Sequence, residues 1–276
     1  MEIRFQSSPT EVKGMSTERL RASFLLSNMM KSDEINLTYS HYDRVIVGGV
    51  NPIHQKISLP NEPELRADNF LERREIGIIN LGGPGVVEAD AVLYDLSKLD
   101  ALYLGKGTQS VCFSSKLADN PAFFFLMSTA AHHAYPATKI TKEQASPVKL
   151  GDTSTANKRT IYKYIHEDGA QSCQLVMGLT LLEDGSVWNS VPPHTHTRRT
   201  EVYFYFDLPE MHRAFHFMGE PEETRHIVMA NHEAVISPPW SVHFGSGTSN
   251  YGFIWAMAGE NKAFTDMDAL QLSDLK

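Results

Sequence analysis

The chain has 276 residues, of which 42% are hydrophobic and 21% charged, and its formal net charge is −8. This length suits one large domain or two small ones with a sizeable core. The negative charge argues against a nucleic acid partner, and no stretch has the length and apolarity of a membrane span. The first residues lack a signal-peptide pattern, so we expect a cytoplasmic protein.

The N-terminal segment predicts one short helix within residues 16–30. Apolar residues recur at helical spacing between Leu20 and Met29, and Ser16 or Thr17 is a suitable N-cap. We expect this helix to pack on a β-barrel or on a partner subunit.

From about residue 44 onward the sequence predicts β-strands in two blocks. Short runs of β-branched and aromatic residues, such as Glu75–Leu81 and Val202–Phe206, end at glycine or proline turns. A linker-like stretch at residues 130–157 separates the blocks. Many short strands with few helical periods favour a sandwich or a barrel.

A metal site is predicted from residues far apart in the sequence. His194 and His196 lie two apart, so an extended strand puts both imidazoles on one face. Glu201 lies at an odd offset from them and joins them only if Thr197–Thr200 bulges or turns. His243 follows a proline-rich turn. A lone His-x-His is more often a surface pair, but the added carboxylate and histidine favour Zn²⁺, with Mn²⁺, Fe²⁺ and Ni²⁺ as alternatives.

The two blocks also resemble each other. Residues 73–79 resemble residues 198–204 when Glu75 is aligned with Glu201, and residues 100–105 resemble residues 233–238. We expect a duplication whose first half keeps the barrel and lacks the metal ligands.

The ligand pattern is similar to the two motifs of the cupin family, which are His-x-His-x₃₋₄-Glu and a proline-led His. It departs from them because Gly185 lies further upstream than usual and the turn reads Pro238-Pro239-Trp240. At full length the chain resembles the 5-keto-4-deoxyuronate isomerase family of pectin breakdown. The segments that carry this likeness are Tyr39–Arg44, Phe70–Glu75, Asn157–Ile161, His194–Phe206, Glu223–Met229, Ile236–His243 and Phe253–Asn261.

The resemblance implies a mainly β protein of two tandem cupin-like jelly-roll barrels with few short helices. Residues 1–135 would form the barrel without metal ligands and residues 136–276 the metal-binding barrel. It further implies one zinc per subunit, held by His194, His196, Glu201 and His243, and a homo-oligomer, expected to be a hexamer. The implied activity is a zinc-dependent ketol isomerisation of 5-dehydro-4-deoxy-D-glucuronate to 3-deoxy-D-glycero-2,5-hexodiulosonate in uronate catabolism.

Such chemistry assigns roles to further residues. A metal on the C1 and C2 oxygens would polarise the carbonyl and stabilise an enediolate, while a base moves the proton. A guanidinium should bind the substrate carboxylate, for which Arg199 and Arg225 are candidates. His226 or Tyr203 would lie near the reacting carbons. The sequence does not fix the base, and Arg199 and His226 equally suit a solvated turn and a packed strand.

Two other functions fit the same ligands. A metal-dependent dioxygenase would need redox-active iron or copper and would consume oxygen. A sugar-binding cupin with a structural zinc would hold its metal tightly and show no turnover, as a closed site with four protein ligands does.

Overall fold

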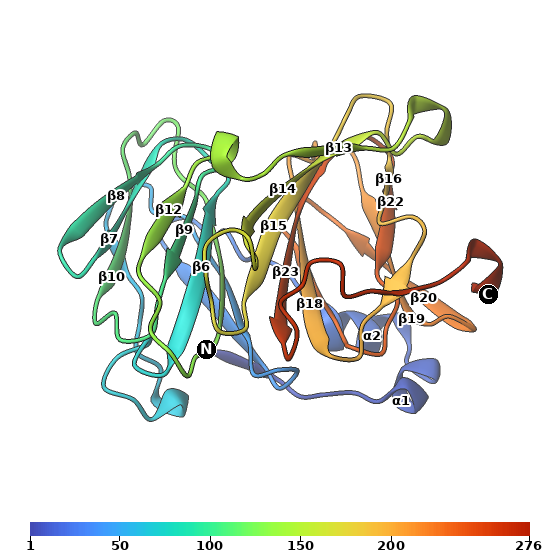
Figure 1. Ribbon diagram of the computed structural model, residues 1–276, viewed down its shortest axis with the longest axis horizontal. Coiled ribbons are helices and arrows are strands. Elements are labelled where there is room, and N and C mark those ends of the chain that lie inside the picture. Colours follow the sequence, from blue (N-terminus) through green and yellow to red (C-terminus); the bar gives the residue numbers. More distant parts are fainter. The chain divides into compact units, whose positions relative to one another are not determined.

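The structure, a computed structural model that describes residues 1–276, is mainly β, as the sequence predicts (Figure 1). Its helices are short, and none has the length and apolarity to cross a bilayer. They are α1 (Pro9–Lys13), α2 (Thr17–Phe24) and the 3₁₀ turns η1 (Pro63–Leu65), η2 (Lys142–Gln144), η3 (Thr153–Thr155) and η4 (Leu272–Asp274).

The predicted helix is shorter than expected. The Ser16 side chain accepts a hydrogen bond from the Arg19 amide at 3.2 Å and starts α2, but the helix ends at Phe24 rather than near Met30. The next two residues, Leu25 and Leu26, form β2 and pair with a strand of the C-terminal half. Strand pairing thus takes over Leu25, which the helical spacing had counted.

Two compact units make up the chain, and neither is continuous in sequence. The first contains residues 1–4, 28–146 and 164–176, and the second contains residues 5–27, 147–163 and 177–276. This division differs from a single cut between residues 135 and 136. The N-terminal helices and β2 belong to the second unit, because β2 lies at the edge of its sheet beside β21 (Ala234–Ser237).

Each unit contains a seven-stranded and a four-stranded sheet. In the first unit the larger sheet has the order β1 (Glu2–Arg4), β3 (Ile35–Ser40), β4 (Ile46–Val50), β11 (Phe124–Ala130), β6 (Arg74–Asn80), β9 (Ala101–Leu104) and β12 (Thr138–Ile140). The smaller sheet has the order β5 (Ile57–Ser58), β10 (Val111–Ser115), β7 (Gly85–Ala89) and β8 (Val92–Leu96). Apolar side chains from both sheets, such as Ile78, Leu126, Val87 and Phe113, share one buried core.

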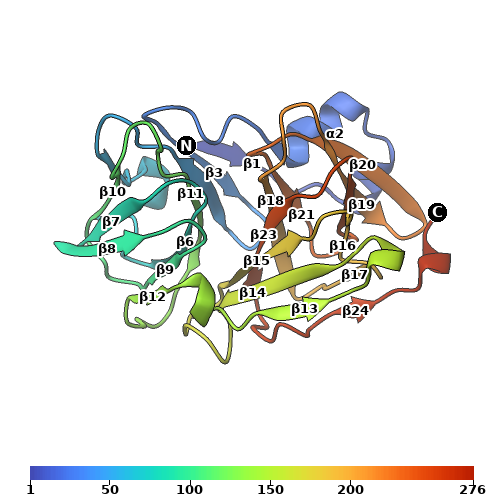
Figure 2. The same ribbon diagram turned by 90° about the horizontal axis from the view of Figure 1, so that it is seen from above.

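The second unit repeats this plan. Its larger sheet has the order β13 (Val148–Leu150), β14 (Arg159–Ile165), β15 (Val176–Leu182), β23 (Gly252–Gly259), β18 (Arg199–Phe206), β21 and β2. Its smaller sheet has the order β16 (Trp188–Asn189), β22 (Phe244–Gly247), β19 (Ala214–Glu220) and β20 (Glu223–Met229). A third ladder joins β17 (His194–Thr195) to β24 (Asp268–Ala269). Figure 2 shows β13 beside β14, its antiparallel partner.

The two units correspond strand by strand, but one residue out of the register that the sequence suggests. The carbonyl of Arg73 accepts a hydrogen bond from Ala131 just as that of Arg198 accepts one from Glu260, both at 2.9 Å. Counting along β6 and β18 from these two carbonyls places Ile76 opposite Glu201. Glu75 therefore corresponds to Thr200 and does not occupy the position of Glu201.

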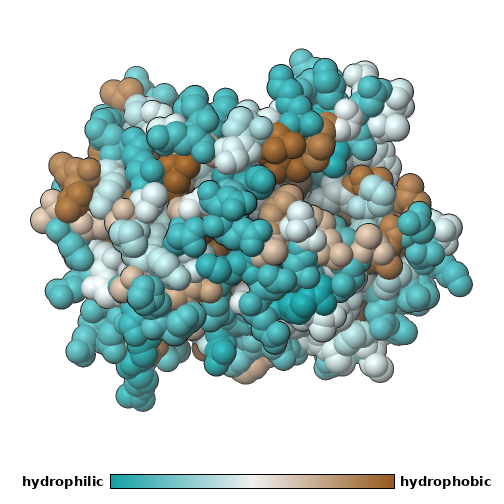
Figure 3. Space-filling model, in the orientation of Figure 1, coloured by the Kyte–Doolittle hydropathy of each residue, from teal (hydrophilic) through white to brown (hydrophobic).

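The face drawn in Figure 3 is mainly hydrophilic, with hydrophobic residues in small separate patches. This matches the excess of acidic residues in the sequence.

Candidate metal centre

His194 and His196 lie at the start of the segment that contains three of the four candidate metal ligands. His194 belongs to β17, and a turn at Thr197 and Arg198 follows His196 before β18 begins. The Arg199 amide donates to the His196 carbonyl at 3.3 Å and closes this turn. The turn that the odd spacing of Glu201 requires is therefore present.

Glu201 and His243 reach the same point from other elements. Glu201 lies in β18 between β21 and β23, where Ser237 and Met257 are its neighbours. His243 lies immediately before β22, after a turn in which the Ser241 amide donates to the Pro238 carbonyl. The proline-led turn thus places this histidine, as the sequence suggested.

The four side chains converge on one point. The ligand atoms of His194, His196, Glu201 and His243 all lie within 4.8 Å of one another. Glu201 Oε2 lies 3.0 Å from His196 Nε2 and 2.8 Å from His243 Nε2. The Nε2 atoms of His194 and His243 are 3.0 Å apart. Spacings of about 3 Å suit neighbouring ligands on one ion whose bonds are about 2.1 Å long. No other group of three or more such residues is present in the chain.

The outer hydrogen bonds of the cluster orient the imidazoles for a metal. Nδ1 of His196 donates to the Arg199 carbonyl at 2.9 Å, and Nδ1 of His243 donates to the Ser241 carbonyl at 3.1 Å. A carbonyl oxygen only accepts, so each ring carries a proton on Nδ1, which leaves Nε2 as the nitrogen that can bind a metal. Lone pairs and a carboxylate that face one another repel, and a cation bound between them would remove this repulsion.

Burial sets the charge of the cluster. The pKa of His194 falls to about 3, because the side chain is partly buried and His243 lies beside it, so His194 is neutral at physiological pH. Burial alone would raise the pKa of Glu201, but the adjacent imidazoles of His243 and His196 lower it well below its usual range. Neutral imidazoles with one carboxylate form a donor set that suits Zn²⁺ and related divalent ions.

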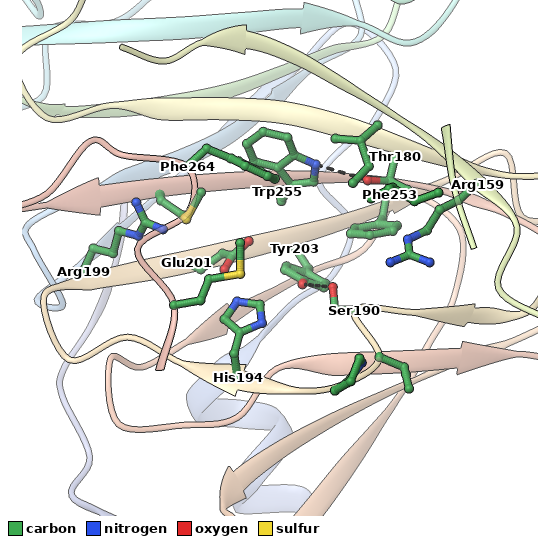
Figure 4. Close-up of a pocket in the computed structure, with 16 residues that line it drawn as sticks. Arg159, Thr180, Ser190, His194, Arg199, Glu201, Tyr203, Phe253, Trp255 and Phe264 are labelled. Atoms are coloured by element: carbon green, nitrogen blue, oxygen red, sulfur yellow. Dashed lines mark hydrogen bonds between the residues drawn. The ribbon is translucent and has the colours of Figure 1, made fainter. Parts of the chain in front are cut away.

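A pocket of about 230 Å³ opens beside the cluster (Figure 4). Glu201 is the only acidic residue among its lining side chains, and most of the walls are apolar. The lining comprises Leu150, Arg159, Ile161, Thr180, Ser190, Val191, Pro192, His194, Arg199, Glu201, Tyr203, Phe253, Trp255, Met257, Phe264 and Met267. Such a site combines a few polar groups with walls that exclude water.

Of the two residues that we expected near the reacting carbons, Tyr203 lines this pocket. It is buried, and its hydroxyl lies 2.7 Å from Ser190 Oγ. Burial, together with the nearby Glu201 carboxylate, raises the pKa of Tyr203 well above its usual value. The phenol therefore keeps its proton and can donate a hydrogen bond into the pocket.

The two consecutive arginines of the ligand segment stabilise one wall of the pocket. The guanidinium of Arg199 donates to the carbonyls of Asn261, Ala263 and Asp266 at 2.8–3.1 Å. Arg198 pairs with the carboxylates of Asp266 and Asp268 at 2.9 Å. Both hold the segment of residues 261–268, which carries the lining residues Phe264 and Met267.

Arg225 and His226, by contrast, do not line the pocket. Arg225 lies in β20 and donates to the carbonyls of Val12, Lys13 and Met15, so it stabilises the N-terminal segment. His226 is exposed and packs beside Phe215 at a ring distance of 6.4 Å. The structure therefore gives no support to the expectation that these two residues act on a substrate in this pocket.

Sequence reasoning missed several lining residues. Arg159 stands in a segment that carried the family resemblance, but spacing gave it no role. Ser190 lies just before the proline pair that precedes His194, and Trp255 donates from its indole to Thr180 Oγ1 at 3.2 Å. These residues line the pocket because the order of the strands in the sheets brings them together, and the sequence does not reveal that order.

Comparisons with known proteins agree with this architecture. The model of the KduI/IolB family matches residues 25–273. A protein of Halalkalibacterium halodurans named 4-deoxy-L-threo-5-hexosulose-uronate ketol-isomerase is 51% identical over 276 residues, which is the full length of both chains. A protein of Enterococcus faecalis named 4-deoxy-L-threo-5-hexosulose-uronate ketol-isomerase 1 is 50% identical, again over the full length of both.

Solved structures with little sequence identity share the fold. An IolB-like protein from Salmonella typhimurium LT2 superposes with a TM-score of 0.68 at 13% identity, over 90% of this chain and 96% of the other. Oxalate decarboxylase from Bacillus subtilis superposes with a TM-score of 0.56 at 10% identity, over 79% of this chain and 70% of the other. At such identities the likeness supports the fold and not the activity.

Proposed function

This chain belongs to the KduI/IolB family, and we propose that it is a ketol-isomerase that converts 4-deoxy-L-threo-5-hexosulose-uronate with the help of one divalent metal ion. The relatives with this name match it from end to end at about half identity. The observation that carries the proposal is the convergence of three imidazoles and one carboxylate beside an apolar pocket. Its substrate would be an open six-carbon chain with an aldehyde at C1 and a carboxylate at C6.

His194, His196, Glu201 and His243 would hold the ion. When bound, a divalent cation polarises a carbonyl and stabilises the negative charge that develops on its oxygen. We propose zinc, since borderline imidazole ligands and one carboxylate suit it, although the same donors also accept Mn²⁺, Fe²⁺ or Ni²⁺.

The remaining residues would orient the substrate and handle its protons. The Tyr203 hydroxyl, held by Ser190, carries a proton at the wall of the pocket and can donate it to a substrate oxygen. The apolar walls around Phe253 and Trp255 would exclude water, which strengthens each polar contact inside. The site requires no redox change of the ion, because an isomerisation moves hydrogen within one molecule.

The direct test is conversion of the substrate. Metal-replete protein is incubated with the unsaturated-uronate breakdown product, and the aldehyde and the new ketone are followed by NMR. We expect the aldehyde signal to disappear and a C2 ketone to appear, without oxygen consumption. The His243→Ala variant should lose this activity. No conversion by the wild type would refute the isomerase, and oxygen uptake would favour a dioxygenase instead.

We also propose that the protein is a homo-oligomer, with a hexamer as the expected state. Light scattering coupled to size-exclusion chromatography measures its mass directly, for comparison with 30.9 kDa for one chain.

A further inference from the structure

The pocket is also lined by positively charged side chains that do not belong to the metal cluster. Three basic side chains line the pocket, namely Arg159, Arg199 and His194. His194 is a neutral member of the cluster. The two arginines lie on opposite sides of the pocket in Figure 4, with Glu201 and Tyr203 between them.

Arg199 uses both of its terminal nitrogens to bind the fold, and only its buried Nε has no hydrogen-bond partner. Its guanidinium binds three backbone carbonyls, and its side chain is 1% exposed. The first unit gives an independent comparison, because Arg74 occupies the equivalent position in β6. Arg74 is also buried and donates to the carbonyls of Arg44 and Ser128. An arginine with the same role in a unit without the metal cluster marks this position as structural.

Arg159 differs from both in its contacts. It starts β14, and its guanidinium makes one hydrogen bond, from Nη1 to the carbonyl of Asn157 at 2.8 Å. It takes part in no ion pair, although other arginines in this unit, such as Arg198, pair with carboxylates. Burial lowers the pKa of Arg159, and only Tyr203 opposes this effect, so no acidic side chain compensates the cost of desolvating the charge. The rest of the guanidinium is available to a ligand.

The position of Arg159 suits the far end of a substrate. Figure 4 shows Tyr203 and Ser190 between His194 and Arg159. A six-carbon chain whose reacting end lies at the metal cluster would extend past Tyr203 toward Arg159. Its C6 carboxylate would then meet a partly desolvated guanidinium, which binds carboxylates through two parallel hydrogen bonds.

We propose that Arg159 binds the substrate carboxylate and makes the enzyme specific for uronates over neutral sugars. This inference rests on the proposed function for the identity of the substrate. Because the carboxylate takes no part in the hydrogen transfer, the contact is equal in the ground state and the transition state. Its loss should therefore raise KM and leave kcat nearly unchanged.

The test compares Arg159→Gln, Arg159→Lys and wild type on the uronate. We expect KM to rise about 10- to 100-fold in Arg159→Gln, the loss that a charge-assisted hydrogen bond predicts. The KM of Arg159→Lys should lie between those of wild type and Arg159→Gln. Lysine keeps the positive charge but lacks the planar guanidinium that binds a carboxylate through two hydrogen bonds. Arg213→Gln removes the same charge from an exposed turn outside the pocket and serves as the matched control. Circular dichroism and metal content should be unchanged in all variants.

A binding measurement separates this inference from the proposed function. Titration of the metal-replete proteins with D-glucuronate and with D-glucose is followed by the fluorescence of Trp255 in the pocket wall. Wild type should prefer the uronate, and Arg159→Gln should lose that preference. If Arg159→Gln keeps both its KM and its preference for the uronate, Arg159 is not the carboxylate site. If wild type binds the uronate through Arg159 but converts none of its proposed substrate, the proposed function fails and the binding role stands.

Discussion

Ile76 in β6 and Glu201 in β18 occupy equivalent positions in the two units of the chain. Ile76 pairs with Ser128 of β11, and Glu201 pairs with Met257 of β23. Ile76 packs in the core of the first unit with 1% of its surface exposed, whereas Glu201 faces three histidines. An alkyl side chain thus replaces the only carboxylate of the cluster.

The first prediction concerns metal content. Wild type should bind one divalent ion per chain, and Glu201→Gln should weaken binding by more than about 100-fold, since even outer partners of a ligand contribute 10- to 100-fold. Elemental analysis after dialysis measures this. Glu75→Gln is the matched control, because Glu75 is a buried carboxylate that accepts from the amides of Cys173, Gln174 and Leu175. It should lower stability and keep the metal. Equal metal loss in both variants would contradict the assignment.

The second prediction compares two tyrosines in β18. Tyr203→Phe should lower kcat about 100-fold, the usual effect of removing a group that donates a proton in the transition state. Tyr205→Phe removes a hydroxyl that lies 3.0 Å from His216 Nδ1, away from the residues that line the pocket. It should leave kcat within about threefold. Similar kcat values in the two variants would exclude Tyr203 from the chemistry.

A third prediction separates stability from substrate binding at the arginines. Arg199→Met leaves three partly buried carbonyls without their donor, so the free energy of unfolding should fall by about 3 kcal/mol. Chemical denaturation measures this change. Arg225→Met should leave KM unchanged, because its guanidinium binds the N-terminal segment. A large rise of KM in Arg225→Met, with stability intact, would restore it as a substrate contact.

The fourth prediction follows from a buried histidine that does not line the pocket. His216 bridges Tyr205 and Ser237, and burial, with His243 nearby, lowers its pKa from 6.5 to about 3. As the pH falls below 6.5 the unfolded chain takes up this proton and the folded chain does not. The stability from this group is fully present above pH 6.5 and is lost toward pH 3, at about 1.4 kcal/mol per pH unit.

Denaturation of wild type and His216→Gln at several pH values between 4 and 7 tests this. The free energy of unfolding of the variant should change less steeply with pH than that of wild type, by about 1.4 kcal/mol per pH unit, which is the contribution of one proton. Parallel curves for the two proteins would mean that His216 carries its proton in the folded state.

The sequence predicted the fold class and the four side chains that converge in the cluster, because each depends on local pattern. Alternation and turn residues indicate strands, and the spacing of His194, His196 and Glu201 already required the turn that the structure contains at Thr197. The family resemblance supplied the activity, which no spacing could supply. The family match and the full-length relatives confirm that resemblance.

What the sequence did not predict depends on long-range pairing. β2 joins the second unit because Leu25 pairs with Val235, 210 residues further along the chain. The one-residue error in the repeat arose because Glu75 was matched to a glutamate by identity, whereas hydrogen bonds fix its true register. The roles of Arg199, Arg225 and Arg159 differ only in which partners the fold brings to them, and neighbouring residues in the sequence do not reveal those partners.

The most direct test of the account is a zinc titration of protein stripped of metal by a chelator, with the initial rate of ketol isomerisation as the readout. The rate should be near zero without metal, rise linearly and reach its plateau at one equivalent of zinc per chain, and His243→Ala should stay inactive throughout. Full activity in the stripped protein, or activity that is independent of added divalent metal, would contradict a catalytic ion held by these four side chains.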